Sequence, residues 1–311
     1  MTQSLDVSVV VESYNLAEGT SAVERFRLAL AAASQMLAVC GAGELLVTDA
    51  AGDPAVAELL DREFPRARLV DARGLGYDEA KYKAAVEAAS EYVVFLDGDC
   101  VPNDQWLRAH LEALRAGAHA TTGVTRYDGG WRSAVESVLD FGFMFPPRAR
   151  WVDCYGSNNS GFRRDTLIAT PHPQGPMRCT CYAHARELKR RGTPVRLVPD
   201  AKTRHEPQPL VAERYRQGFD TIASCWIDTS LPEARLLRLG VAAAPLFYAR
   251  AVVNDWRRLL QSRRELGLAS WQAVVSLPLF PLLRLIDLAG MVRALAPRGR
   301  ASGVGLKAAA K

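Results

Sequence analysis

Two carboxylates separated by one residue stand where a buried strand is expected to end. Residues 92–96 form an apolar run of the type found in β-strands, and the run stops at Asp97-Gly98-Asp99. Ligands of open α/β sheets bind outside the carboxyl ends of the strands. Gly98 allows the chain to turn there, so both carboxylates can approach one divalent cation. The alternative is an acidic turn without further function, because Asp-Gly turns are common.

The segments before this acidic pair alternate between strand-like and helix-like patterns. We expect strands at residues 7–11, 44–48, 68–70 and 92–97, separated by helices at residues 21–39, 54–64 and 78–90. Such a βαβαβ order with short connections predicts a parallel sheet covered by helices on both faces. It also predicts a nucleotide-type crevice at the strand ends.

The later part of the chain has a different pattern. Residues 123–204 are turn-rich and close with a helix at residues 183–191, a helix stop at Gly192 and a strand at residues 195–198. Loops that lie over a rigid sheet commonly carry specificity. From residue 207 to about residue 297 the pattern is helical.

The size and composition of the chain fit one large domain or two modest ones. Its 311 residues are 49% hydrophobic and 23% charged, which is enough to bury a full core. We expect an α/β domain at residues 1–206 and a helical extension at residues 207–311. No apolar signal precedes the first strand, which favours a reduced, cytosolic compartment. The cysteine spacing does not supply the pairs of a zinc knuckle, so we expect structural roles for Cys40, Cys100, Cys154, Cys179, Cys181 and Cys225.

Basic charge is concentrated in the helical extension. From residue 231 onward there are thirteen Lys and Arg against four Asp and Glu, a net charge of +9, whereas the preceding 230 residues carry −4. Prolines and charges interrupt the most apolar stretch, residues 274–296, so we do not expect a clean membrane span. The pattern favours amphipathic segments on an anionic membrane surface, and the alternative is a helical subdomain packed on the catalytic domain. Nucleic-acid binding is not expected, because no stacking motif accompanies the basic residues.

Several segments follow one another in a characteristic order. They are VSVVVESYN at 7–15, LLVTD at 45–49, residues 74–84, FLDGD at 95–99, NNSGFRR at 158–164 and VPDAKTRH at 198–205. In this order the chain resembles a bacterial family 2 glycosyltransferase of the GT-A fold. The helical extension is similar to the membrane-associating helices that follow many bacterial members. The resemblance implies a Rossmann-like, mostly parallel central sheet and a nucleotide diphosphate sugar as the donor.

The resemblance also implies a role for each polar residue at the strand ends. Mg²⁺ or Mn²⁺ would be bound by Asp97, Asp99 and His205, although an isolated histidine at a strand end is more often simply hydrogen-bonded. The cation would stabilise the departing diphosphate. Nucleotide-sugar contacts are implied for Ser13, Tyr14, Asn15, Asp49, Lys81 and Asp97, and acceptor-side contacts for Asn158 and Asn159. Two positions depart from the family pattern, because Glu12 replaces a proline and Tyr82 an asparagine.

The sequence does not identify the general base. Inverting members of the family carry an acidic segment before the glycine that ends the helix, and its Asp deprotonates the acceptor hydroxyl. Counting back from Gly192 reaches Cys179-Thr180-Cys181, which contains no carboxylate. A neutral thiol is a poor base near neutral pH, since its unperturbed pKa is about 8.5. One explanation is that a loop acid, Asp153 or Asp165, serves as the base, although Asp165 is equally suited to cap a helix. A second is that the acceptor needs little help from a base.

We therefore expect a metal-assisted, inverting glycosyltransferase of cell-envelope polysaccharide synthesis. Its donor would be a UDP- or GDP-linked sugar, its acceptor a glycan or a lipid-linked glycan, and its location the cytoplasm, peripheral to the inner face of the cell membrane. A scaffold that binds the nucleotide sugar without transferring it is favoured by the missing base, while the intact metal ligands argue against it. A nucleotidyltransferase would need a Gly-rich basic loop after the first strand, where residues 12–15 read Glu-Ser-Tyr-Asn.

Overall fold

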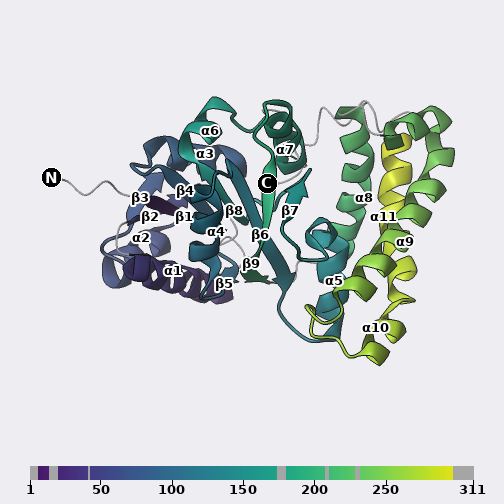
Figure 1. Cartoon of the computed structure of the whole chain (residues 1–311), viewed down its shortest axis with the longest axis horizontal. Coiled ribbons are helices and arrows are strands. Elements are labelled where there is room, and N and C mark those ends of the chain that lie inside the picture. The colour runs from purple at the N-terminus through teal and green to yellow at the C-terminus, as the bar shows by residue number, and fades with distance from the viewer. Residues whose placement is uncertain are drawn as a thin grey trace. The chain divides into compact units, whose positions relative to one another are not determined.

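Two units divide the part of the chain that the computed structural model describes, namely residues 6–13, 20–40, 43–173, 180–206, 210–227 and 232–296 (Figure 1). The sheet unit consists of Met1–Arg126, Pro147–His172 and His184–Glu206. The helical unit consists of Tyr127–Pro146, Pro173–Ala183 and Pro207–Lys311. The functional boundary expected between residues 206 and 207 stays a prediction, and two earlier segments also group with the helical unit.

The sheet unit begins with parallel strands. They are β1 (Val7–Glu12), β2 (Gly43–Asp49), β3 (Arg68–Asp71) and β4 (Tyr92–Asp97), with β1 between β2 and β4. The helices that connect them are α1 (Thr20–Cys40), α2 (Pro54–Glu63) and α3 (Tyr77–Glu87). Every residue of β1 and β4 is buried, as expected of Val-rich strands covered on both faces. The α/β class with a mostly parallel central sheet is confirmed.

Strands from the second half of the unit extend this sheet. They are β5 (Cys100–Pro102), β6 (Ala120–Tyr127), β7 (Arg150–Val152), β8 (Asn159–Arg163) and β9 (Val195–His205). The sheet order is β3-β2-β1-β4-β8-β6-β9-β5, and β7 also pairs with β9. β8 runs antiparallel to β4, and β5 runs antiparallel to β9. This order brings the end of β9 back to the residues that follow β4.

The region expected to be irregular contains regular elements. Among them are the short helix α6 (Arg164–Ala169) and the whole of β9, which continues past the predicted end at residue 198 to His205. The second half of β9 alternates buried and exposed residues, because one face packs on the core while Lys202 and Arg204 face solvent. The sequence pattern identified only its apolar first half. The helix expected at residues 183–191 is α7 (Thr180–Arg190), which is followed by Gly192 at φ 80°.

A buried polar cluster joins helix α4 (Trp106–Arg115) to the sheet. The side-chain oxygen of Asn159 accepts hydrogen bonds from Trp106 Nε1 at 2.8 Å and His110 Nε2 at 2.9 Å. Its amide nitrogen donates to the Ala201 carbonyl oxygen at 3.1 Å and to Thr203 Oγ1 at 3.2 Å. Every hydrogen-bonding position of this amide is thus used inside the sheet unit.

The helical unit packs around closely spaced glycines. Its elements are α5 (Trp131–Phe141), α8 (Leu210–Ile227), the 3₁₀ segment η3 (Pro232–Ala243), α9 (Ala244–Ser262), α10 (Ser270–Ser276) and α11 (Leu279–Leu295). A Cβ atom on Gly218 of α8 would lie 1.9 Å from the Asp287 carbonyl oxygen, and one on Gly290 of α11 would lie 2.0 Å from the Tyr215 carbonyl oxygen. Only glycine permits this approach of α8 to α11.

Charged side chains lie inside the helical unit and bind one another. Arg284 Nε lies 2.7 Å from Asp255 Oδ2, and the same guanidinium pairs with Asp287. Arg214 pairs with Asp140 and lies 3.6 Å from Asp287 Oδ2. Buried charges of this kind are tolerated when they are paired, and removing one partner is costly. The network therefore fixes α5, α8, α9 and α11 against each other.

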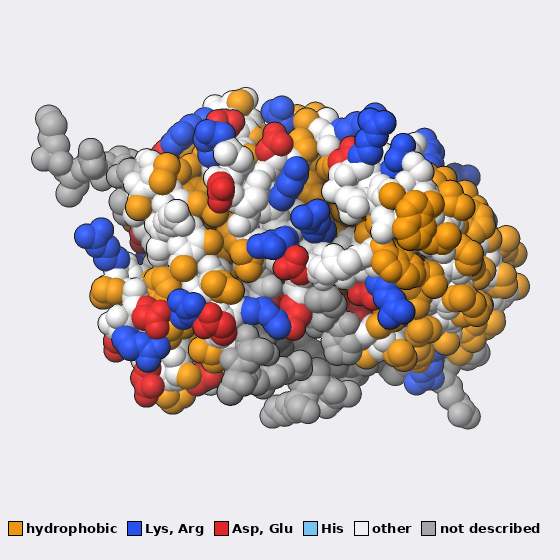
Figure 2. Space-filling view, turned by 90° about the horizontal axis from the view of Figure 1, so that it is seen from below, with side chains coloured by type: hydrophobic (Ala, Val, Ile, Leu, Met, Phe, Trp, Pro, Cys, Tyr) orange, Lys and Arg blue, Asp and Glu red, His pale blue; other side chains and the backbone are white. Residues whose placement is uncertain are grey.

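The helical unit exposes many hydrophobic side chains. Figure 2 shows hydrophobic side chains gathered over it, and Trp271, Val274 and Leu282 are among those exposed. The same unit also exposes basic side chains, among them Arg235, Arg257 and Arg264, so its surface combines apolar and basic residues. These apolar C-terminal helices fit the predicted membrane-associating extension.

Among the described residues of the helical unit, two segments are long and apolar enough to cross a membrane, judged by length and composition alone. They are Glu233–Ser262, with a mean hydropathy of 1.5, and Ser270–Leu295, with a mean hydropathy of 1.7. The sequence analysis expected no clean membrane span at residues 274–296, whereas Ser270–Leu295 meets this criterion of length and composition. The charges behind that expectation, Arg284 and Asp287, are buried and paired within one turn of α11.

Buried histidines make the sheet unit sensitive to acid. Burial lowers the pKa of His110 and His172 from 6.5 to about 4, and that of His184 to about 3. Below pH 6.5 the unfolded chain therefore binds protons that the folded chain does not, so stability is full above that pH and falls as the pH drops. We predict a loss of about 2 kcal/mol per histidine between pH 7 and pH 5, measured by urea unfolding.

The control for this prediction is a histidine outside this buried set. His110→Gln should reduce the pH dependence, whereas His119→Gln, at a half-buried position, should leave it as in the unmodified protein. An unfolding midpoint that is the same at pH 7 and pH 5 would contradict the prediction.

Candidate functional site

The carboxyl ends of β1 and β2 carry the first predicted nucleotide-binding residues. Ser13 Oγ donates a hydrogen bond to Asp49 Oδ1 at 3.1 Å, and the backbone amide of Ala51 donates to the same oxygen at 3.1 Å. Both Ser13 and Asp49 are buried at this edge of the sheet. Their contacts hold one face of the Asp49 carboxylate in place. Tyr14 and Asn15 lie outside the described residues.

Asp97, at the end of β4, is held by two side chains of α3. Lys81 Nζ lies 2.5 Å from Asp97 Oδ1 and donates to the Ser157 carbonyl oxygen at 2.8 Å. Tyr77 Oη lies 2.8 Å from each carboxylate oxygen of Asp97. Burial acts to lower the pKa of Lys81, but the charge of Asp97 opposes this and the pKa is raised overall. The Asp97 charge is therefore neutralised by Lys81 inside the protein.

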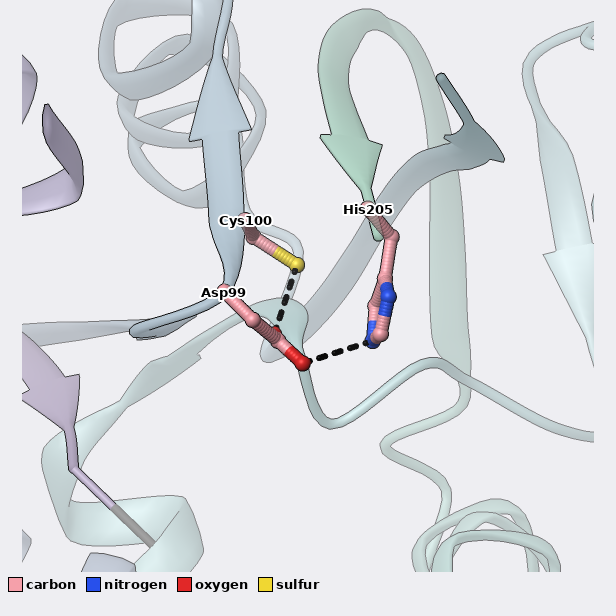
Figure 3. A group of neighbouring side chains, drawn as sticks. All are labelled: Asp99, Cys100 and His205. Atoms are coloured by element: carbon pink, nitrogen blue, oxygen red, sulfur yellow. Dashed lines mark hydrogen bonds and ion pairs between the residues drawn. The ribbon is translucent and has the colours of Figure 1, made fainter. Parts of the chain in front are cut away.

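Asp99 points into a different cluster, with Cys100 and His205 (Figure 3). Asp99 Oδ2 lies 3.5 Å from His205 Nε2, and Cys100 Sγ lies 3.7 Å from Asp99 Oδ1. One ligand atom from each residue lies within 4.8 Å of the others, a set that could hold a metal ion. Burial raises the pKa of Asp99, the adjacent His205 lowers it, and the negative charge of Asp97 raises it again, with a raised pKa as the result.

Gly98, between the two acids, lies at a close approach of the chain to β1, and the side chains on either side of it face different partners. A Cβ atom on Gly98 would lie 2.6 Å from Phe26 Cδ2 and 2.8 Å from the Glu12 carbonyl oxygen. Gly98 also donates its backbone N–H to that carbonyl at 2.9 Å. The chain therefore passes too close to β1 for any side chain here. Of the predicted metal ligands, Asp99 and His205 come together, whereas Asp97 faces Lys81.

Cys100 is the member of the cluster that sequence reasoning did not assign to the site. Cys100 directly follows the acidic pair in the sequence. No other cysteine lies at a metal-ligand spacing from it, so the sequence analysis interpreted it as a structural residue. Its partner appears only in the sheet register, where Cys100 lies directly opposite His205.

The predicted acceptor-side residues lie where β8 begins. The backbone N–H of Asp97 donates to the Asn158 carbonyl oxygen at 3.4 Å, and Asn158 Oδ1 accepts from Thr125 Oγ1 at 3.2 Å. Asn158 therefore borders the acidic pair. The side chain of Asn159 is fully used within the buried polar cluster, so an acceptor could bind it only by breaking those bonds. The acceptor-side role stays a prediction, and the geometry favours Asn158 for it.

The two candidate bases lie away from the acidic pair. Asp165 follows Arg163, which pairs with the first residue of β4, while Asp97 is the last, so roughly 16 Å of strand separates them. Hydrogen bonding to Arg163 also lowers the pKa of Asp165, which makes it a weaker base. Asp153 follows β7 at the end of β9 opposite to His205, and it pairs with Lys189 at 2.6 Å. Cys179 lies outside the described residues.

A comparison with protein families identifies the domain that carries this site. Residues 44–169 match the family described as Glycosyl transferase family 2, and the matched segment includes Asp97 and Asp99. This part of the chain is a family 2 glycosyltransferase domain, which confirms the predicted resemblance and the predicted class of enzyme, a glycosyltransferase. His205 lies beyond the matched residues, so its place in the site rests on the geometry.

Solved structures share the fold. Mannosyltransferase PcManGT from Pyrobaculum calidifontis, in complex with GDP-Man and Mn²⁺, is similar with a TM-score of 0.60 and 17% identity, over 94% of this chain and 88% of that chain. GalNAc-T7, with UDP, GalNAc and Mn²⁺, is similar with a TM-score of 0.51 and 12% identity, over 67% of this chain and 45% of that chain. These likenesses confirm the GT-A fold. No curated protein matches the sequence.

The acidic pair should differ sharply in its effect on stability. Asp97→Asn leaves Lys81 buried without its carboxylate, so we predict a loss of about 3 to 5 kcal/mol. Asp99→Asn removes a carboxylate whose ionised form is disfavoured by burial, so stability should be unchanged or higher. Chemical unfolding of both variants in EDTA measures the difference. Equal losses in the two variants would contradict the assigned division between Asp97 and Asp99.

Proposed function

We propose that this chain transfers a glycosyl group from a UDP- or GDP-linked sugar to a glycan or a lipid-linked glycan, assisted by Mn²⁺ or Mg²⁺. The observation that carries the proposal is the pair of Asp99 and His205, 3.5 Å apart, beside the acidic segment of a family 2 glycosyltransferase domain. PcManGT with GDP-Man and Mn²⁺, and GalNAc-T7 with UDP and Mn²⁺, support the donor and the metal.

In this proposal, different residues at the strand ends bind different parts of the donor. Asp99 and His205 would hold the cation, which supplies positive charge to the departing diphosphate. Lys81 adds a buried positive charge behind Asp97 and keeps that carboxylate oriented. Asp49 is placed to accept hydrogen bonds from the nucleoside, with Ser13 fixing its carboxylate. The donor would thus lie across the carboxyl edge of β1, β2 and β4.

Neither of the two candidate bases is placed to remove the acceptor proton. Inversion needs a base beside the acceptor hydroxyl, and neither Asp153 nor Asp165 stands near Asp99. This observation favours the competing function, a scaffold that binds the nucleotide sugar without transferring it. The two functions differ in turnover, because a scaffold binds the donor with its cation but neither hydrolyses nor transfers it.

The helical unit supports a location at the inner face of the cell membrane, with the sheet unit in the cytoplasm. Its hydrophobic side chains are exposed while its charged residues Arg214, Arg284 and Asp287 are buried. The net charge of +9 from residue 231 onward matches an anionic surface. A lipid-linked acceptor would be reached from such a surface.

Removing the carboxylate of Asp99 should abolish metal-dependent catalysis. We predict that Asp99→Asn lowers Mn²⁺-dependent turnover of the nucleotide sugar at least about 100-fold, because the cation loses a charged ligand. Sugar-nucleotide hydrolysis and transfer to a glycan acceptor are measured together. Asp165→Asn serves as the control and should keep activity within about twofold, since Asp165 lies at the far end of β4. Full activity of Asp99→Asn would overturn the assignment.

Removing apolar side chains from the helical unit should weaken membrane binding. We predict that the combined change Trp271→Ser, Val274→Ser and Leu282→Ser lowers affinity for vesicles containing anionic lipid at least about tenfold, because less apolar surface is buried. Vesicle flotation measures the bound fraction.

The matched control carries the same number of apolar-to-serine changes in the sheet unit. Val39, Leu69 and Val86 are exposed there, and replacing them by Ser should leave vesicle binding unchanged. If both triple variants bind as the unmodified protein does, the helical unit is not the membrane-binding part.

A further inference from the structure

We propose that Cys100 is a third ligand of the cation site and gives it a preference for thiophilic cations, Zn²⁺, Co²⁺ and Cd²⁺, over Mn²⁺ and Mg²⁺. This inference rests on the proposed function in placing the cation between Asp99 and His205. Oxygen and imidazole ligands alone suit Mn²⁺, whereas a thiolate selects softer metals.

The sheet register places the thiol and the imidazole on the same side. Cys100 and His205 are directly opposed in the antiparallel pair of β5 and β9. Directly opposed residues project to the same face, with Cβ atoms about 4.5 to 5.5 Å apart. Figure 3 shows the Cys100 thiol and the His205 ring converging on the carboxylate of Asp99. The next pair, Val101 and Arg204, alternates to the other face.

Two separations between ligand atoms are close to those around a small tetrahedral ion, and all three ligand atoms lie within 4.8 Å of one another. The two separations are 3.5 Å from Asp99 Oδ2 to His205 Nε2 and 3.7 Å from Asp99 Oδ1 to Cys100 Sγ. Zinc with bonds of about 2.0 to 2.3 Å has ligand-to-ligand edges of roughly 3.3 to 3.8 Å. The two contacts use different oxygens of Asp99, so a rotation of that carboxylate would bring the three residues onto one ion.

His205 is held in the tautomer that a metal site needs. Its Nδ1 lies 2.6 Å from the Glu206 carbonyl oxygen. A carbonyl oxygen only accepts, so Nδ1 carries a hydrogen and Nε2 is the ring atom that can present a lone pair to a metal. That lone pair faces the Asp99 carboxylate. A cation bound there would contact both Nε2 of His205 and the carboxylate of Asp99.

A structural role is the competing explanation for Cys100. A buried cysteine packs as a small apolar residue, and Cys100 does belong to the hydrophobic core. In that role the thiol does not bind the metal. As a ligand, the thiol instead loses its proton to solvent and forms a sulfur-to-metal bond, without any change of oxidation state.

Cobalt distinguishes the two roles without any nucleotide. Titration of the full chain with Co²⁺ should produce a thiolate-to-cobalt charge-transfer band in the near ultraviolet. Cys100→Ser and Cys100→Ala should both lose this band. The control Cys225→Ser changes a cysteine that is also buried, but in the helical unit, and should keep the band. A saturated Co²⁺ complex of the unmodified protein without the band overturns the proposal, and so does a band that persists in a folded Cys100 variant.

Metal preference gives a second readout. Competition titrations should show that Cys100→Ser weakens Zn²⁺ binding at least about tenfold and changes Mn²⁺ binding much less. Equal losses for both metals would mean that the thiol is not a selective ligand. The proposed function is tested separately by Mn²⁺-dependent binding of UDP or GDP. If that binding is present while Zn²⁺ affinity is unaffected by Cys100→Ser, only the inference about Cys100 fails.

Discussion

The burial of Asp97 at the end of a central strand is the constraint on which the sheet unit depends. Asp97, at the end of β4, is only 4% exposed, and its carboxylate is bound by Lys81 and Tyr77 instead of by water. These two residues are four apart on α3, which places them on one face of that helix and fixes it against the sheet. Lys81 also binds the Ser157 carbonyl oxygen, which positions the chain before β8. With Asp97 neutralised, Asp99 is the carboxylate left to face His205.

In the helical unit, the corresponding constraint is a network of buried ion pairs. Its charged side chains bind each other inside, where Arg284 reaches both Asp255 and Asp287. Its surface exposes both hydrophobic residues and arginines, and the close contact of α8 and α11 at Gly218 and Gly290 needs no large side chains between them. Such an arrangement is unfavourable in water and favourable against lipid. Under the proposed function, the sheet unit would carry out the donor chemistry and the helical unit would give access to a membrane-bound acceptor.

Local patterns were sufficient to predict the parallel half of the fold. Val-rich runs gave β1 and β4, and the acidic turn after residue 96 located the candidate site, because both signals lie within a few neighbouring residues. Local patterns could not predict which strands pair when they are far apart in the sequence. The opposition of Cys100 and His205, 105 positions apart in the sequence, exists only once β5 pairs with β9. For the same reason the sequence could not reveal that Asn159 is used inside the sheet unit, or that Asp165 lies at the far end of β4.

The central claim is that the acidic edge of the sheet binds a nucleotide diphosphate sugar through a cation. Calorimetric titration of the unmodified protein with UDP, GDP and their sugar conjugates, first in Mn²⁺ and then in EDTA, tests it most directly. The account predicts binding of one class of nucleotide that is present with Mn²⁺ and lost in EDTA. Absence of binding to every nucleotide, or binding of equal strength in EDTA, would contradict it.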